Sequence, residues 1–200
     1  MLLERLPRIG KKLLATGGGR CNLLNENLAA AAFTSTDPGL VGSILDRFGR
    51  KEIQDFFEGL GLRLQADEAG RVYPVTNQAS SVLKVLELET GRLGVPVESG
   101  FEARETEASA EGFRIEAADG RTVTARALVL AGGGKSYPAL GSNGSCYDLA
   151  ASFGHRIVTP VPSAVPLLVK VRMCHLLQGQ KLRVRIESRI GDKRCQRAEG

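Results

Sequence analysis

The stretch Ala127-Leu-Val-Leu-Ala-Gly-Gly-Gly-Lys-Ser136 is the most decisive one for the fold. Apolar residues run without interruption in it and stop at three consecutive glycines. A continuous apolar run is typical of a strand that is covered on both faces, as in a parallel sheet. Glycines directly after such a strand let a ligand approach the backbone. We therefore predict a buried strand of an α/β sheet that ends at a ligand-binding edge.

Helices and short strands are expected around this stretch. Apolar residues at helical spacing predict a helical pair from Pro38 to Gly61, whose aromatic side chains we place in the core. Asp119-Gly120 is a strong hairpin signal between two short strands. Further helices are expected at 82–93 and 144–153, and short strands at 2–4, 62–64, 71–73, 95–97, 101–103, 113–117 and 122–124.

A change of composition separates residues 161–200 from the rest. Pro160, Pro162 and Pro166 mark the boundary, and strands predicted at 167–171 and 182–190 open a β-rich domain. The chain has a net charge of +5, and residues 170–200 carry nine basic residues against three acidic ones. Because charged residues alternate with apolar residues in 181–190, we interpret the basic residues as the solvent-exposed face of a half-buried strand. A phosphate-binding surface is the alternative.

Composition excludes several classes of protein. With 42% hydrophobic and 24% charged residues, the chain is neither disordered nor a collagen-like repeat nor a coiled coil. No membrane span or signal peptide is visible, which predicts a cytoplasmic protein. The four cysteines are scattered without a CxxC pair and the two histidines add no ligand spacing, so neither disulfides nor a metal site are expected.

The loop Ala15-Thr-Gly-Gly-Gly-Arg-Cys-Asn22 is the strongest candidate for a binding site. Its glycines let the backbone point N–H groups at a ligand, and Arg20 offers a planar set of donors. A glycine turn that serves packing alone is an equally open interpretation. A buried thiol is favoured for Cys21 over a nucleophile. An acidic residue at a strand end, such as Glu4, hydrogen-bonds ribose hydroxyls in dinucleotide folds.

Gly132-Gly-Gly-Lys-Ser136 resembles a phosphate-binding P-loop without matching it. The motif needs a first glycine where Val129 stands, and Tyr137-Pro138 interrupts the helix whose N-terminus would hold the phosphate. A nucleotide triphosphatase is therefore disfavoured, although a phosphate-binding protein that uses this loop stays open.

Several motifs together resemble one family, the bacterial YhiN/BaiN-type (aminoacetone-oxidase-like) flavoproteins. The motifs are Glu4, the segment 9–25, Gly70-Arg-Val-Tyr-Pro74, and 131–138 with Gly141-Ser142. The resemblance implies an FAD-dependent oxidoreductase that transfers hydride to or from a small organic substrate, with NAD(P)H as a candidate electron donor and no nucleic acid or membrane as partner. It implies an incomplete doubly wound (Rossmann-like) FAD-binding domain at 1–160 and the start of an inserted β-rich substrate domain at 161–200.

The resemblance also implies the cofactor-binding residues, with Glu4 on the FAD ribose and Arg20 near the flavin, where its charge would stabilise the reduced, anionic form. It assigns no catalytic residue. Family members carry a GxGxxG turn ahead of Glu4, and Leu24 and Gly132 replace threonines, so we expect a fragment; a non-catalytic remnant of the fold is the rival interpretation. The implied FAD-binding residues are Glu4, Lys12, Gly17, Gly18, Gly19, Arg20, Cys21, Asn22, Ala103, Gly132, Gly133 and Gly134.

Overall fold

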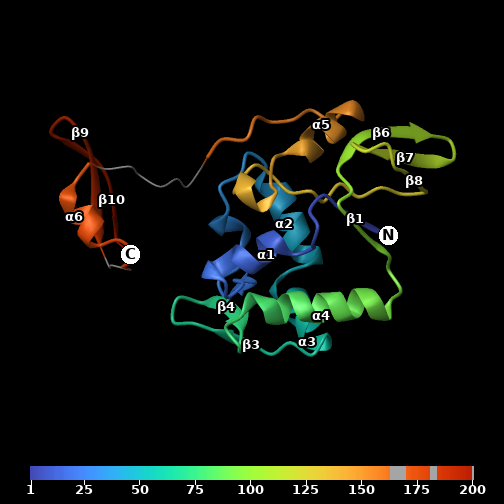
Figure 1. The fold of residues 1–200 in the computed structure, drawn as a ribbon. Coiled ribbons are helices and arrows are strands. Elements are labelled where there is room, and N and C mark those ends of the chain that lie inside the picture. The colour runs from blue at the N-terminus through green and yellow to red at the C-terminus, as the bar shows by residue number, and fades with distance from the viewer. Residues whose placement is uncertain (163–169, 181–183, 200) are drawn as a thin grey trace. The chain divides into compact units, whose positions relative to one another are not determined.

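The computed structural model describes residues 1–162, 170–180 and 184–199 (Figure 1). The chain divides into two compact units, residues 1–159 and 160–200. Among the described residues no helix has the length and apolar character needed to cross a membrane.

Five helices and three short 3-10 turns belong to the first unit. Asp37 caps the second helix, because its side chain accepts a hydrogen bond from Leu40 N at 2.9 Å and Pro38 occupies the first turn. The predicted helical pair is therefore confirmed, and so are the helices at 82–93 and 144–153. The elements are α1 (Lys11–Ala15), α2 (Pro38–Arg47), α3 (Arg50–Gly59), α4 (Ala79–Arg92), α5 (Ser145–Ser152), η1 (Thr16–Gly18), η2 (Ala30–Ala32) and η3 (Pro138–Leu140).

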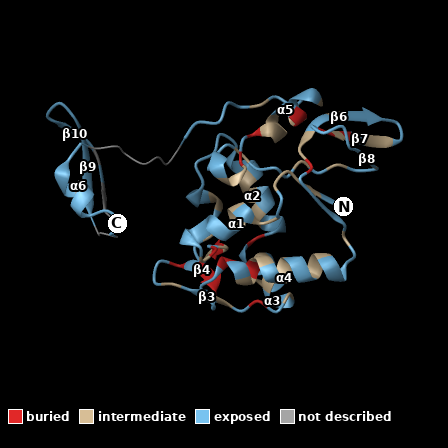
Figure 2. Cartoon of the chain, viewed as in Figure 1, coloured by how far each residue is buried: buried red, intermediate tan, exposed pale blue. Residues whose placement is uncertain are grey.

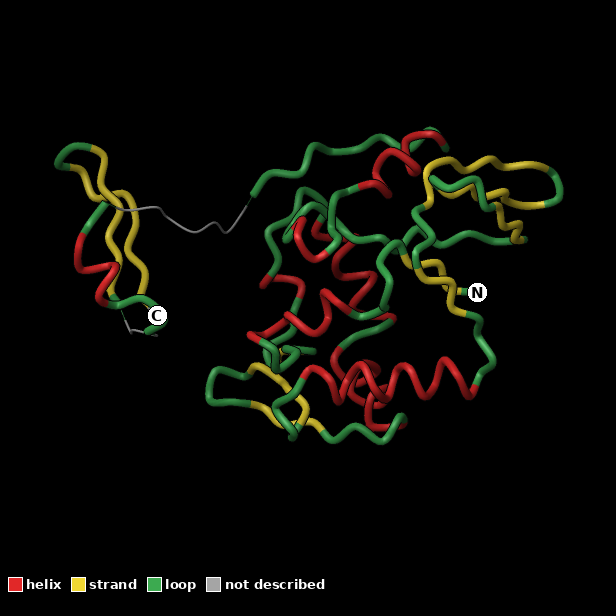
Figure 3. The backbone as a smooth tube through the Cα atoms, viewed as in Figure 1, coloured by secondary structure: helices red, strands yellow, loops and turns green. Residues whose placement is uncertain are grey.

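The strands of the first unit form three small sheets (Figure 3). β1 (Leu2–Glu4) pairs in parallel with β5 (Val97–Ser99). β2 (Leu24–Asn25), β4 (Arg71–Pro74) and β3 (Leu64–Ala66) form an antiparallel sheet with β4 in the centre. β6 (Ala103–Ser109), β7 (Gly112–Ala117) and β8 (Thr122–Ala125) form another, in which the predicted Asp119-Gly120 hairpin is confirmed. The unit is thus a mixed α/β structure whose parallel pairing, over the described residues, is confined to β1 and β5.

The buried strand predicted at residues 127–131 is wrong. These residues lie in a loop, and the side chain of Val129 is 84% exposed. Leu128 packs partly against a hydrophobic cluster, as one residue of an extended segment can do without any strand partner. A strand covered on both faces needs neighbouring strands and covering helices, and no described strand pairs with this segment.

Two hydrophobic clusters hold the first unit together, and Figure 2 shows their buried residues in red. One joins α4 to the glycine loop through Cys21, Leu62, Ala79 and Val82. The other lies on the β6–β7–β8 sheet, and Leu3 of β1 packs against it. Its buried members are Phe101, Ile115 and Ala117.

The prediction that the aromatic residues of the helical pair are core residues is largely wrong. Phe57 packs against the first cluster, but Phe48 is 51% exposed and Phe56 is exposed as well. Leu40, Ile44 and Phe48 recur every four residues, so they share one side of the helix. All of them are exposed, because no described element of the unit covers that side.

The second unit contains α6 (Arg172–Leu176) and an antiparallel hairpin of β9 (Arg185–Ile190) and β10 (Lys193–Glu199). The strand predicted at 182–190 is confirmed over 185–190, but its predicted half-burial is wrong, since Ile190 is 78% exposed and Ile186 is exposed too. A two-stranded hairpin has no second layer to bury its apolar face. Of the strands predicted at 167–171 and 182–190, residues 167–169 and 182–183 lie outside the described residues, and 170–171 are not in a strand.

The Asp119-Gly120 turn allows a prediction about pH. Arg121 donates to the Asp119 carboxylate from Nε at 2.8 Å and from its backbone N–H at 3.1 Å. The Arg121 side-chain hydrogen bond, followed by the backbone one, lowers the pKa of Asp119 below the usual 3.8. Because the folded state then binds fewer protons, the stabilisation is present above the ordinary pKa and is lost as pH falls through the lowered one.

We therefore expect the Asp119 carboxyl carbon to titrate below pH 3.8 in an NMR pH series. In Arg121→Ala the midpoint should return towards the usual value. A wild-type midpoint at or above the usual value contradicts the hydrogen-bonded turn.

Candidate functional site

The loop of residues 16–22 is a compact turn, and the backbone of its three glycines lies in the left-handed region of φ. Gly17, Gly18 and Gly19 have φ values of 57°, 67° and 86°. The carbonyl oxygen of Thr16 accepts hydrogen bonds from Gly19 N and Cys21 N, both at 3.0 Å. The loop is fastened to the start of α4, because Ala79 N donates to Gly19 O at 2.8 Å.

The glycines of this loop differ in what surrounds them. A Cβ on Gly17 would lie 2.7 Å from the backbone nitrogen of Asn22, so internal packing excludes a side chain there. A Cβ on Gly18 would meet no atom within 4 Å, and the residue is exposed. Gly18 therefore leaves open space beside the backbone, as a ligand that contacts the backbone requires.

Three further residues of the loop point in different directions. Cys21 is 3% exposed and belongs to the cluster with Leu62 and Val82, so its thiol packs in the core. Asn22 is exposed. Arg20 folds back over the loop, where its Nε donates to Gly17 O at 3.3 Å and its Nη2 donates to the hydroxyl of Tyr73 at 3.2 Å.

The loop of Gly132, Gly133 and Gly134 packs against the start of α5. A Cβ on Gly132 would collide with the sulfur of Cys146, and one on Gly134 would lie 3.0 Å from the hydroxyl oxygen of Tyr147. Gly133 has a φ of 74°. The first and last of these glycines therefore let α5 approach the loop closely.

The first 12 residues bring this second loop beside the start of the glycine loop. Lys12 Nζ donates to Ser136 Oγ at 3.1 Å, and Lys11 Nζ donates to Ala139 O at the same distance. Arg5 Nη2 donates to Gly141 O at 2.6 Å. In Figure 1, η3, which follows the second glycine loop, lies above α1. The helix that leads into the first glycine loop thus contacts the segment that begins at the end of the second.

Three lysines of this region have no carboxylate partner among the described residues of the first unit, whereas Arg5 pairs with Glu102 at 3.7 Å. Within residues 1–162, Lys11, Lys12 and Lys135 form no ion pair, since their contacts are with carbonyl and hydroxyl oxygens or with the backbone of Gly144. An ammonium group next to a hydroxyl and to glycine backbone is a chemistry that binds phosphate.

Glu4 and Ala103 lie next to the second hydrophobic cluster, which contains Phe101. One carboxylate oxygen of Glu4 accepts a hydrogen bond from Leu6 N at 2.8 Å, which leaves the second oxygen available as an acceptor. Glu4 O accepts from Phe101 N at 2.9 Å, so β1 is tied to the chain that leads into β6. Ala103 packs with Leu3 on the second cluster and contributes a methyl group there.

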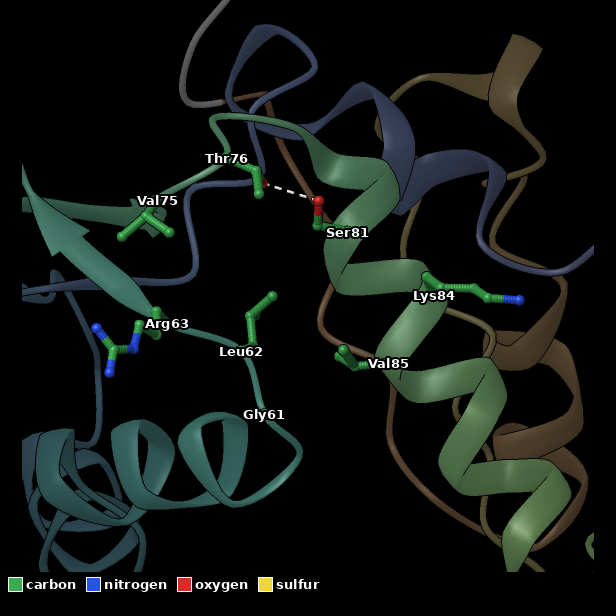
Figure 4. Close-up of a pocket in the computed structure, with 8 residues that line it drawn as sticks. All are labelled: Gly61, Leu62, Arg63, Val75, Thr76, Ser81, Lys84 and Val85. Atoms are coloured by element: carbon green, nitrogen blue, oxygen red, sulfur yellow. Dashed lines mark hydrogen bonds between the residues drawn. The ribbon is translucent and has the colours of Figure 1, made fainter.

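A surface pocket of about 390 Å³ lies elsewhere, between β3, β4 and α4 (Figure 4). Thr76 Oγ1 donates to Ser81 Oγ at 2.8 Å on its rim. Figure 4 shows the side chains of Arg63 and Lys84 pointing away from each other, so these two cations do not converge on one ligand. The pocket contains none of the predicted FAD-binding residues. It is lined by Gly61, Leu62, Arg63, Val75, Thr76, Ser81, Lys84 and Val85.

Sequence reasoning did not identify Tyr73 as a site residue, and it considered Ser136 only in the phosphate-binding alternative. Tyr73 lies within the Gly70–Pro74 motif and Ser136 within the second glycine loop, so both motifs contained the signal. Their contacts with Arg20 and Lys12 span 53 and 124 residues of sequence and arise only in the folded chain.

Comparison with known proteins places these motifs in a family context. The model of the HI0933-like protein Rossmann domain matches residues 1–183, which confirms the resemblance found from the motifs. The chain is 40% identical over 190 residues to the 3-dehydro-bile acid delta(4,6)-reductase of Clostridium scindens, covering 95% of this chain and 46% of that protein.

More distant relatives have a different name. The chain is 27% identical over 178 residues to the ribosomal RNA dihydrouridine synthase of Escherichia coli, covering 89% of this chain and 44% of that protein. It is 25% identical over 189 residues to the protein of the same name from Haemophilus influenzae, covering 92% and 47%. The chain spans about half the length of the curated relatives that it matches.

Proposed function

We propose that this chain, which belongs to the HI0933-like protein Rossmann domain family, forms the FAD-binding part of a flavin-dependent reductase. The observation that carries the proposal is the hydrogen bond from Lys12, in the helix that leads into the first glycine loop, to Ser136 at the end of the second. Gly18 of the first loop adds a backbone with open space beside it. Lys12 and Gly18 are among the predicted cofactor residues, and the names of the relatives denote a reductase and two synthases of dihydrouridine.

The residues present fit FAD by their chemistry. Lys12 and Ser136 would bind phosphate oxygens, since the ammonium group has no carboxylate partner within residues 1–162. The free carboxylate oxygen of Glu4 would accept hydrogen bonds from ribose hydroxyls. The exposed loop of Gly17, Gly18 and Gly19 would lie against the flat part of the cofactor.

The flavin, when bound, supplies two-electron exchange with an organic substrate. The protein's own contribution is binding and electrostatics. Arg20 adds a fixed positive charge at the loop, held by Gly17 O and the Tyr73 hydroxyl, and this charge favours a negatively charged partner.

The names of the relatives also narrow the class of substrate. A delta(4,6)-reductase acting on a 3-dehydro compound and a synthase that makes dihydrouridine both add two electrons and two protons to a carbon–carbon double bond conjugated with a carbonyl. We extend this class, an α,β-unsaturated carbonyl compound, to the whole protein, with a reduced nicotinamide as the electron source. A small molecule is favoured over RNA because the chain is 40% identical to the bile acid reductase and 27% identical to the RNA enzyme.

Equilibrium binding of FAD to the purified chain tests the proposal. We expect saturable binding of one FAD per chain, with ATP failing to compete at equal concentration. Lys12→Ala should weaken FAD binding and reduce its dependence on salt, because one phosphate contact is lost. Saturable binding of ATP without any binding of FAD would overturn the proposal and favour the phosphate-binding alternative; binding of neither would favour the non-catalytic remnant.

The charge of Arg20 leads to a separate prediction. Arg20→Ala should lower the reduction potential of the bound flavin by tens of millivolts, since about 1.4 kcal/mol of lost stabilisation corresponds to about 30 mV for two electrons. Arg20→Lys keeps the charge and is the matched control, with a potential close to that of the wild type. Spectroscopic redox titration of the three proteins decides the point, and an unchanged potential in Arg20→Ala would show that its charge does not act on the flavin.

A further inference from the structure

The geometry points to Tyr73 as the positioning residue of the glycine loop, which fixes the shape of residues 16–22 and presents Arg20 to the ligand. Its effect on FAD rests on the proposed function. Its effect on the shape of the loop is independent of any ligand, so the two parts are tested separately.

Tyr73 is rigidly placed. It lies in β4, the central strand of its sheet, with Gln65 of β3 opposite to it and Val72 beside it paired with Leu24 of β2. The residue is 3% exposed. Pairing on both sides of β4 holds the backbone that carries Tyr73, and burial restricts the ring to the space that it fills.

The side chain of Tyr73 contacts the loop in three ways. The guanidinium carbon of Arg20 lies 4.2 Å from the centre of the Tyr73 ring, within the range of a cation–π contact. Arg20 Nη2 donates to the Tyr73 hydroxyl at 3.2 Å. A Cβ on Gly17 would lie 3.2 Å from Cε1 of the ring, so the ring edge lies against the backbone of the loop.

Arg20 closes these contacts into a ring of interactions. Its Nε donates to Gly17 O at 3.3 Å, so Tyr73 holds Arg20 and Arg20 holds the first glycine. A guanidinium group has five N–H donors, and Nη1 of Arg20 makes no hydrogen bond within residues 1–162. Arg20 can therefore bind an acceptor on a ligand while it stays on Tyr73.

The backbone of the loop needs such support. Its three glycines and Cys21, whose φ is 61°, are four residues in the left-handed region within a stretch of five. A non-glycine residue in this region is unfavourable by itself. Burial of Cys21 on one side and the Tyr73–Arg20 contact on the other keep the turn in this conformation.

Amide hydrogen exchange in the absence of FAD tests the first part. The N–H groups of Gly19 and Cys21 both donate to Thr16 O, so their exchange reports opening of the loop. We expect Tyr73→Leu to accelerate their exchange at least tenfold relative to amides within α4. Tyr73→Phe keeps the ring and should stay within a few-fold of the wild type. Equal acceleration at the loop and in α4, or none at the loop, would overturn the positioning role.

FAD affinity tests the second part. Tyr73→Leu should weaken FAD binding at least tenfold, and Tyr73→Phe should restore most of the affinity. If the loop opens in Tyr73→Leu but FAD affinity is unchanged, the role of Tyr73 at the site is overturned. If the wild-type chain binds no FAD, the proposed function fails, and the exchange experiment still decides whether Tyr73 fixes the loop.

Discussion

Gly18→Ala is expected to weaken FAD binding at least tenfold while lowering the free energy of unfolding by only about 1 kcal/mol. The stability cost arises because an alanine at a φ of 67° is strained, although its Cβ would meet no protein atom within 4 Å. The loss of affinity arises because the Cβ would fill the space that the cofactor needs beside the backbone. Titration with FAD and urea denaturation of the same sample give both numbers.

Gly17→Ala is the matched control for this prediction. Its φ of 57° is similar, but its Cβ would lie 2.7 Å from Asn22 N, so the protein itself must shift. We expect Gly17→Ala to lose clearly more stability than Gly18→Ala. Wild-type affinity for FAD in Gly18→Ala would show that the triple glycine serves the turn alone, which is the packing interpretation left open by the sequence.

Phe101→Ala is expected to lower the free energy of unfolding by about 3–5 kcal/mol, the range found for truncating a buried phenylalanine. Phe101 is 3% exposed, packs with Ile115 and Ala117, and lies under the guanidinium of Arg121 at 5.2 Å. Leu3 of β1 packs against the same cluster, so loss of the ring should disturb the end of β1 where the ribose contact is proposed.

Phe48→Ala makes the same change of side chain at an exposed position. Phe48 is 51% exposed at the end of α2, and we expect a loss of no more than about 0.5 kcal/mol. Urea denaturation followed by circular dichroism measures both variants. Equal losses for Phe101→Ala and Phe48→Ala would contradict the placement of the core in the β6–β7–β8 sheet.

The elements that sequence analysis predicted correctly depend on local signals. The start of α2 is specified by Asp37 and Pro38, and the β7–β8 hairpin by Asp119 and Gly120, within a few residues of the element itself. The strand predicted at 127–131 failed because an apolar run indicates that a segment can be buried but not which neighbours pair with it. The prediction that the aromatic residues of the helical pair are buried failed for the same reason.

The candidate site was predictable to a similar degree. The triple glycine of 17–19 identified the loop, because consecutive glycines mark a backbone with unusual conformations. The long-range partners were not predictable by spacing, since Tyr73 contacts Arg20 of the loop and Ser136 contacts Lys12 from distant parts of the chain. Composition also gave no means of separating a glycine needed for packing, such as Gly17, from one with open space, such as Gly18.

Mapping where FAD protects the backbone is the measurement that tests the central claim most directly. Hydrogen exchange of the chain with and without saturating FAD should show protection at residues 16–22 and 132–136 together, because Lys12, in the helix before the first loop, contacts Ser136 of the second. The pocket lined by residues 61–63, 75–76, 81 and 84–85 should be unaffected. Protection confined to that pocket, or absent from both glycine loops, would contradict the account.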